Sequence, residues 1–167
     1  MRRTEAVRAG VSMYERSLRS VEDSTRLLQP AASNRKLGNG RTTWRVGPYK
    51  GQPLYSLTLQ ERDTCPSACP AWTDCYGNNM PFARRIDVRK GGLEKNLELE
   101  IRQLSRRHPD GFTVRLHVLG DFFSVDYVLF WERMIRTYPV SVYGYTHRTD
   151  QIGDEIDRVY RDNPRRS

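Results

Sequence analysis

The sequence contains no long apolar run. None of its 167 positions begins a stretch of 18 consecutive apolar residues, which excludes an ordinary membrane-spanning helix. The basic N-terminus is not followed by a continuous apolar segment, so it does not have the form of a secretory signal. Hydrophobic residues make up 37% of the chain and the mean hydropathy is -0.74. These values are low for a self-sufficient core, so we expect part of the chain to pack loosely or to be completed by a partner chain or an oligomer.

Cysteine is also scarce. The sequence has three cysteines, Cys65, Cys69 and Cys75, and all of them lie within 11 positions. A secreted disulfide framework would be denser and even-numbered. We therefore expect a reducing, cytoplasmic environment in which the thiols are kept for ligation.

Several familiar catalytic motifs are missing. We find no phosphate-cradling glycine-rich loop, no Ser–His–Asp signature and no paired-carboxylate motif. Triads are defined in space, so these absences remove only the support that a linear pattern would give.

Positive charge is abundant but uneven. The net charge is +8; residues 1–50 carry 11 Lys and Arg against 4 Asp and Glu, whereas residues 51–150 carry 13 against 12. We interpret residues 1–50 as a basic, loop-rich arm whose partner is nucleic acid or another polyanion, or as a solvated tail. Trp44 and Tyr49 would stack on the bases of a single-stranded nucleic acid. A hairpin core explains these two aromatic residues equally well.

The remainder, residues 51–167, alternates strands with helices. Strand patterns cover residues 54–60, 112–119 and 140–145, and helical patterns with one apolar stripe cover residues 93–108 and 125–138, with a third from about residue 151. This order predicts an α/β fold of three consecutive βα units with a parallel sheet. Three units cannot close a barrel, so the sheet is expected to be partial and barrel-like, or open.

The flanking segments are less regular. Residues 1–29 have helical spacing that suits one marginal helix, and residues 82–90 are basic and suit the start of a helix. TTWRV, at residues 42–46, is a short strand candidate for a hairpin with the strand at residues 54–60.

Functional residues are expected where the three strands end. In parallel α/β folds, sites form at the carboxyl ends of the strands. Here those ends are the cysteine loop at residues 62–80, Gly120-Asp121, and Thr146-His147-Arg148. All three should lie on one rim.

The cysteine loop is spaced C-x3-C-x5-C, and three thiolates in one short loop can reach one ion. An iron–sulfur cluster is held by thiolates, and three of them on a cubane would leave one iron open. Zinc usually takes four protein ligands, often from paired C-x2-C motifs, and is the alternative. The third interpretation is a set of buried free cysteines.

The run SLTLQERDTCPSACPAWTDCYGNNMPFARR, followed by VRLHVLGDFFSVDYVLFW and YGYTHR, closely resembles the phage "gene product 88" family. The resemblance covers about residues 33–160 and implies a phage-derived protein in the cytoplasm of a bacterial host, but no biochemical role. It also implies a second cysteine-rich segment beyond this point, and if that segment supplies ligands we expect the cysteine site of the present sequence to be incomplete.

A more distant resemblance is to radical S-adenosylmethionine enzymes, which place a three-cysteine loop after the first strand of a partial barrel. It implies that Cys65, Cys69 and Cys75 hold the cluster and that Gly120 and Asp121 lie on the cofactor. The cysteine spacing and the Asp in place of Glu depart from that pattern, so the analogy is one of fold.

Two further residues are candidates on the second strand. Arg115 and His117 occupy its non-aliphatic face, where they would bind an anionic substrate or move a proton, or form structural contacts. Asp121 would bind a cofactor amine or a metal, or would cap the turn before Ser124.

Two hypotheses from different classes follow. The first is an iron–sulfur-binding, radical-SAM-like protein of unknown substrate, whose cofactor carries the chemistry. The second is a non-enzymatic module that binds nucleic acid or a partner and has a structural zinc site. A truncated, inactive relative is a third possibility.

Overall fold

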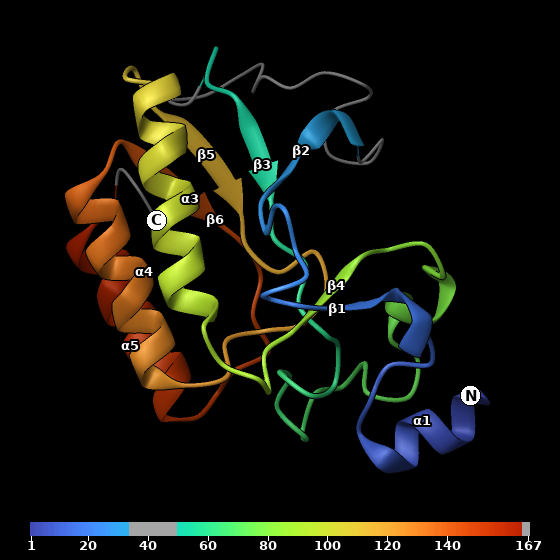
Figure 1. Ribbon diagram of the computed structural model, residues 1–167. Coiled ribbons are helices and arrows are strands. Elements are labelled where there is room, and N and C mark those ends of the chain that lie inside the picture. Colours follow the sequence, from blue (N-terminus) through green and yellow to red (C-terminus); the bar gives the residue numbers. More distant parts are fainter. Residues whose placement is uncertain (34–49, 165–167) are drawn as a thin grey trace.

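Three parallel strands form the centre of the molecule. In the computed structural model, which describes residues 1–33 and 50–164, β3 (Leu54–Ser56) pairs in parallel with β5 (Phe112–Arg115), and β5 pairs in parallel with β6 (Val140–Tyr143). The two-residue strand β2 (Gln29–Pro30) adds antiparallel to the other edge of β3 (Figure 1). The parallel sheet expected from the strand–helix alternation is confirmed.

A second, two-stranded sheet joins the first through a single bridge. Its strands are β1 (Leu18–Ser20) and β4 (Arg85–Asp87), which are parallel. Ile86 of β4 forms a parallel bridge with Leu59, beyond the end of β3, and the Leu59 amide donates to the Leu119 carbonyl at 3.0 Å. The backbone that continues β3 therefore lies between β4 and the residues that follow β5.

The three long helices lie side by side at one end of the molecule (Figure 1). They are α3 (Leu93–Arg107), α4 (Val125–Thr137) and α5 (Gln151–Asp162). Each turns an apolar stripe inward because its hydrophobic residues recur every three or four positions. The stripes of α3 and α4 are buried at Leu93, Leu97, Ile101, Leu104, Val128, Trp131, Met134 and Ile135.

The strand order explains why these helices share a side. β3, β5 and β6 are neighbours in chain order, with no reversal of direction across the sheet. Right-handed crossovers between such strands place every connecting helix on the same face. Among residues 1–33 and 50–164 the strands do not close into a barrel, which agrees with the expected partial sheet.

Side-chain caps fix where two of the helices begin. The Ser124 hydroxyl accepts from the Tyr127 amide at 3.1 Å at the start of α4, as the sequence predicts. Asp150 accepts from the Ile152 and Gly153 amides at the start of α5. Such caps satisfy amides that have no partner within the helix.

The N-terminal segment is mostly irregular. α1 (Arg3–Ala9) ends at Gly10, whose φ of 66° is left-handed, and the chain continues through η1 (Glu15–Ser17), with η2 (Ala31–Ser33) after β2. The single marginal helix expected in residues 1–29 is therefore confined to seven residues. The hairpin candidate TTWRV lies outside the described residues.

The basic character of residues 82–90 had led us to expect the start of a helix, and this prediction is wrong. Arg85, Ile86 and Asp87 form β4 because their backbone groups pair with β1 on one side and with the continuation of β3 on the other. Tertiary pairing overrides local propensity here.

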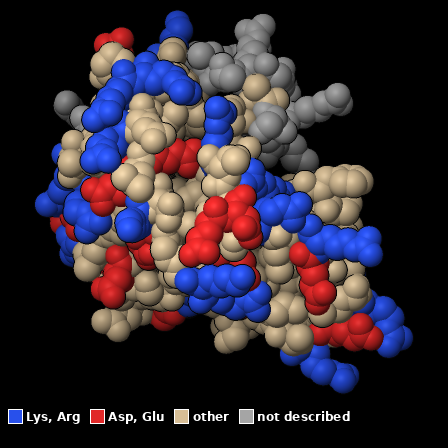
Figure 2. Space-filling model, in the orientation of Figure 1, with Lys and Arg blue, Asp and Glu red and all other residues tan. Residues whose placement is uncertain are grey.

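No helix in the described part of the chain is both long and apolar enough to span a bilayer. Figure 2 shows acidic and basic side chains interspersed on one face, with Lys and Arg gathered over the C-terminal end of α3. Cations near a helix C-terminus are favoured by its dipole.

Candidate functional site

The cysteine loop is built from single turns. Its backbone bonds are local: the amides of Cys65, Cys69 and Trp72 donate to the carbonyls three residues earlier, at 2.9 to 3.2 Å. It ends in η3 (Tyr76–Asn79). Because Pro66 and Pro70 interrupt any regular helix, the loop needs side-chain anchors to hold its shape.

Arg62 is the first of these anchors. It is buried, and its guanidinium donates to the carbonyls of Trp72 and Val11 and to Oδ1 of Asn78, at 2.6 to 3.1 Å. The Trp72 indole in turn donates to the Val7 carbonyl at 3.1 Å. These bonds attach the loop to the segment around α1.

Arg85 is the second anchor and is completely buried, with no exposed side-chain surface. Its Nε lies 2.6 Å from Oε2 of the equally buried Glu61. Its other nitrogens donate to oxygens of four further residues at 2.7 to 3.0 Å, which are Ser17, Gly77, Met80 and Ala83. Glu61 also accepts from the Ser12 hydroxyl at 2.9 Å. One ion pair thus joins the N-terminal segment, the end of β3 and the end of the cysteine loop.

The three thiols are free and half-buried. Burial raises the pKa of Cys65 to about 12, and the charges of Asp121, Cys69 and Cys75 add to that rise. Burial likewise raises the pKa of Cys75. The thiols of Cys65 and Cys75 are therefore protonated at neutral pH and are poor nucleophiles, because only the thiolate reacts.

The thiols are neighbours, but they are not gathered on one point. Within residues 1–33 and 50–164, no three or more His, Cys, Asp or Glu side chains are arranged to hold a metal ion. The donor set has the chemistry that soft metals and iron–sulfur clusters require, since thiolates are their usual ligands. Ligation would therefore require the three sulfur atoms to move together.

Gly120 and Asp121 lie directly against this loop. A side chain at Gly120, whose φ is 82°, would lie 2.6 Å from Oγ1 of Thr64, so only glycine allows the approach. The Asp121 amide donates to that same oxygen at 3.1 Å. The buried Asp121 carboxylate accepts from the amides of Phe122 and His147 at 2.8 and 2.9 Å.

Arg148 completes the junction of the three rim loops. Its guanidinium donates to the carbonyl of Phe122 at 2.6 Å and to that of Thr64 at 3.1 Å, and it pairs with Asp150. The loops that follow β3, β5 and β6 therefore meet, as strand order alone had indicated. Asp121 and Arg148 hold them together through backbone contacts.

Arg115 and His117 have different surroundings. Arg115 lies where its charge opposes the rise in pKa that burial causes at Tyr76 and Tyr143, and its Nε is buried without a partner among the described residues. His117 follows the end of β5 with a φ of 55°. Its ring packs edge-on against Phe122, with Nε2 3.3 Å from the Tyr127 hydroxyl.

Buried side-chain atoms of two residues lack partners in the described part of the chain. They are Nδ1 of His117, whose Nε2 contacts Tyr127, and both amide atoms of Gln60. Gln60 is fully buried and directly precedes Glu61. Unpaired buried groups of this kind are costly unless water or a ligand satisfies them.

Sequence reasoning missed Glu61, Arg62 and Arg85. Glu61 and Arg62 belong to a charged run directly after an alternating strand, and Arg85 belongs to the basic pair Arg84-Arg85. Short charged runs of this kind are usually solvated. Buried polar networks have no periodicity, so the pairing of positions 61 and 85 could not be found from spacing.

A family model described as "Gene product 88" matches residues 25–164. Comparison with curated proteins found no match, and comparison with solved structures found none either.

Proposed function

We propose that this chain, which belongs to the gene product 88 family, is a metalloprotein whose cysteine loop binds an iron–sulfur cluster through Cys65, Cys69 and Cys75. The carboxyl edge of the parallel sheet would be the site where that cluster meets its substrate. The substrate itself is unknown.

One observation carries the proposal. All three cysteines of the chain are free, and they lie together in one loop that two buried arginines anchor at the rim of the sheet. The raised pKa values of Cys65 and Cys75 argue against a nucleophilic role for these two thiols. A bound cation reverses that effect, since it favours the thiolate, so ligation is the role that suits thiols in these surroundings.

The proposal requires a local rearrangement. The span between Cys65 and Cys75 contains single turns and no regular helix or strand. Its fixed points lie outside the sulfur atoms, at Arg62, Trp72 and Asn78. The three thiols can therefore approach one another without breaking the ladder of β3.

The finer proposal is that the protein resembles radical S-adenosylmethionine enzymes. Three thiolates leave one iron of a cubane open, and such a cluster supplies one-electron chemistry to a bound cofactor. Asp121 would receive the cofactor's amino group. Both carboxylate oxygens already accept one amide, but an ionised carboxylate offers about four acceptor positions, so capacity remains.

The test is anaerobic purification followed by quantitation of iron, sulfide and zinc, together with a visible spectrum. The variants are Cys65→Ala, Cys69→Ala and Cys75→Ala, and the control is Ser67→Ala, an exposed residue in the same loop. We expect iron and sulfide in the unchanged protein and in the Ser67 variant, and loss of both from each cysteine variant.

Other results overturn the proposal. One zinc without iron would instead indicate a structural site, and it would remove the basis for radical chemistry. A protein that takes up neither metal, or a cysteine variant that keeps its full iron content, would exclude the proposed ligand set. S-adenosylmethionine binding that requires the cluster would support the finer proposal, and its absence would limit the function to cluster binding.

A further inference from the structure

A hollow of about 960 Å³ lies beside the Arg85 anchor. One wall comes from the N-terminal segment, with Tyr14, Arg16 and Arg19, and the other from the turn after the cysteine loop, with Phe82 and Arg84. Its lining includes none of the three cysteines. It is therefore a separate surface from the proposed cluster site.

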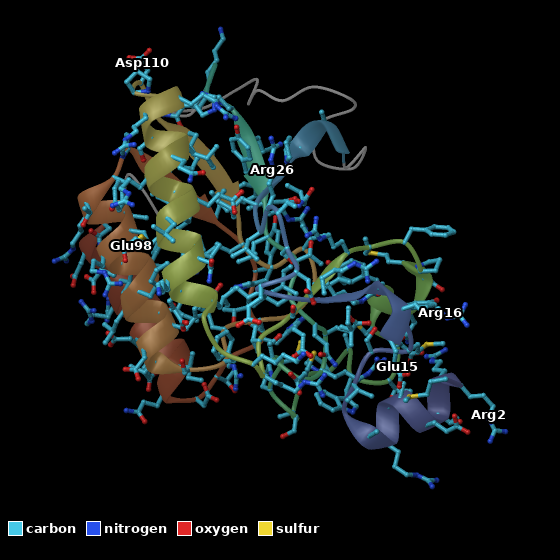
Figure 3. All side chains as sticks on the ribbon, in the orientation of Figure 1. Arg2, Glu15, Arg16, Arg26, Glu98 and Asp110 are labelled. Atoms are coloured by element: carbon cyan, nitrogen blue, oxygen red, sulfur yellow. The ribbon has the colours of Figure 1, made fainter. Side chains whose placement is uncertain are left out.

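The hollow is basic, and its cations are not neutralised. None of Arg16, Arg19 and Arg84 forms an ion pair within the described residues, and Glu15 is the one carboxylate in the lining. Arg19 donates to two backbone carbonyls instead, at 2.7 and 2.8 Å. Figure 3 labels Glu15 and Arg16 on this segment, in the same lobe as α1.

Arg84 adds an unmet donor. Its Nε is buried and has no partner in the described part of the chain. The charge of the guanidinium opposes the rise in pKa that burial causes at Glu100. A buried N–H without an acceptor is costly. Arg84 also lines the hollow, and its guanidinium is well suited to bind phosphate there.

Phe82 supplies an aromatic face at the edge of the hollow. Its side chain is 97% exposed. The turn that carries it is fixed, because the Ala83 amide donates to the Met80 carbonyl and the Ala83 carbonyl accepts from Arg85. An exposed aromatic ring on a rigid turn is positioned before any ligand arrives, so stacking on it costs little ordering.

The wall formed by the N-terminal segment is also held in place by specific contacts. The Tyr14 ring lies 5.2 Å from the Arg85 guanidinium, and its hydroxyl donates to the Asn78 carbonyl. Ser17 is held by Arg85 as well. The same buried arginine thus fixes both walls.

We propose that this hollow binds single-stranded nucleic acid, with phosphates on Arg16, Arg19 and Arg84 and a base stacked on Phe82. Sequence-tolerant binding of single strands combines a cationic groove with stacking aromatics in this way. A single strand fits a concave surface that has one exposed ring. Duplex recognition would call for a helix or ribbon that enters a groove, and η1, the helical element of the lining, has only three residues.

This proposal goes beyond cluster binding and does not depend on it. It also changes where the nucleic-acid contact is expected within the basic first 50 residues. The sequence had indicated Trp44 and Tyr49, which lie outside the described residues, whereas the hollow uses Arg16 and Arg19 from the start of that arm and adds Phe82 from beyond it.

The experiment is fluorescence anisotropy of the full chain with a labelled 20-nucleotide single strand, over a series of salt concentrations. Phe82→Ala should weaken binding about tenfold or more, and the fold should persist because the ring is exposed. The double variant Arg16→Ala/Arg19→Ala should reduce the slope of log affinity against log salt by about 1.4, which is about 0.7 for each lost phosphate contact.

Two controls match these changes elsewhere on the surface. Tyr145→Ala removes a ring that is 80% exposed, and Arg102→Ala/Arg106→Ala removes two exposed arginines from α3. Both control variants should bind like the unchanged protein. Equal losses in the controls would show non-specific charge attraction and would overturn the proposal, as would the absence of binding or a preference for duplex of the same length.

Discussion

The two halves of this molecule are stabilised by different forces. The half that contains α3, α4, α5, β5 and β6 buries aliphatic and aromatic side chains in one continuous core, which reaches into the other half only at its edge, for example at Val21 and Ile86. The lobe that joins the N-terminal segment to the cysteine loop and β4 buries charged and polar groups, among them Glu61, Arg62 and Arg85. Apolar burial is non-directional, whereas hydrogen-bonded charges require fixed geometry. We call the first half the platform, because its apolar core tolerates small shifts, and the second half the lobe, because its hydrogen-bonded charges require a fixed geometry.

The most direct test of this difference is to remove the positive charge of Arg85, which lies at the centre of the lobe. Arg85→Met leaves the Glu61 carboxylate buried without its cation and removes the hydrogen bonds that Arg85 donates to four further residues. Loss of one partner of a buried pair costs about 3–5 kcal/mol of unfolding free energy. We expect trypsin to cleave the variant within residues 1–33 and 57–92 while residues 93–162 stay protected.

The matched control is Arg89→Met. Arg89 pairs with Asp87 two positions away, but its side chain is 54% exposed, so its loss should cost about 1 kcal/mol or less. Urea denaturation measures both variants. An Arg85 variant no less stable than the Arg89 variant would contradict the role given to the buried pair.

The next largest effect tests the platform. Leu97→Ala empties a site on α3 that has no exposed surface, and it should cost about 2–5 kcal/mol. Leu99, two positions along the same helix, is 40% exposed, and Leu99→Ala should change stability by about 0.5 kcal/mol or less. If the lobe depends on the platform, the Leu97 variant will lose protection in both halves together. Cleavage confined to one half would count against that dependence.

The smallest effect concerns pH. Burial lowers the pKa of His117 to about 3, from its ordinary value near 6.5. The folded protein therefore keeps this ring neutral, whereas the unfolded chain gains a proton below about pH 6.5. The stability due to His117 is complete above pH 6.5 and is lost as the pH falls toward about 3, and the loss reaches about 2 kcal/mol at pH 5.

His117→Asn tests this dependence. Asn tolerates the positive φ of this position, and it cannot take up a proton in this range. We expect the variant to be less stable at pH 7, and its stability to fall less between pH 7 and pH 5. His147→Asn makes the same chemical change on an exposed loop. A His117 variant with an unaltered pH profile would show that the ring does not carry this dependence.

The sequence predicted the platform much better than the lobe. The stripe of Leu93, Leu97 and Ile101 and the cap at Ser124 follow from helical periodicity and from the need of free amides for an acceptor. The parallel order of β3, β5 and β6 follows from the alternation of strands with helices. These are local rules that leave a repeating signal in the chain.

The lobe leaves no such signal. Strand β4 is three residues long, and its pairing depends on partners at positions 18–20 and 59. Asp121 shows at the candidate site why sequence alone does not decide a role. A carboxylate at this position suits a turn cap, a metal ligand and a cofactor contact equally well. Its bonds to Phe122 and His147 are a matter of tertiary geometry. The three thiols of the cysteine loop were identified from spacing, and their metal remains a proposal.

The pairing of β1 with β4 has a consequence for the order of assembly. Leu18 faces Arg85, 67 positions later in the chain, and a loop of that length must close before the pairing forms. During synthesis β1 emerges before β4, and among the described residues it has no other strand partner, so it stays unpaired until β4 leaves the ribosome. Contacts of such long range form slowly. Strand β1 is thus made before β4 but is expected to be among the last elements to pair, and until then the hollow that we propose as a nucleic-acid site is not formed.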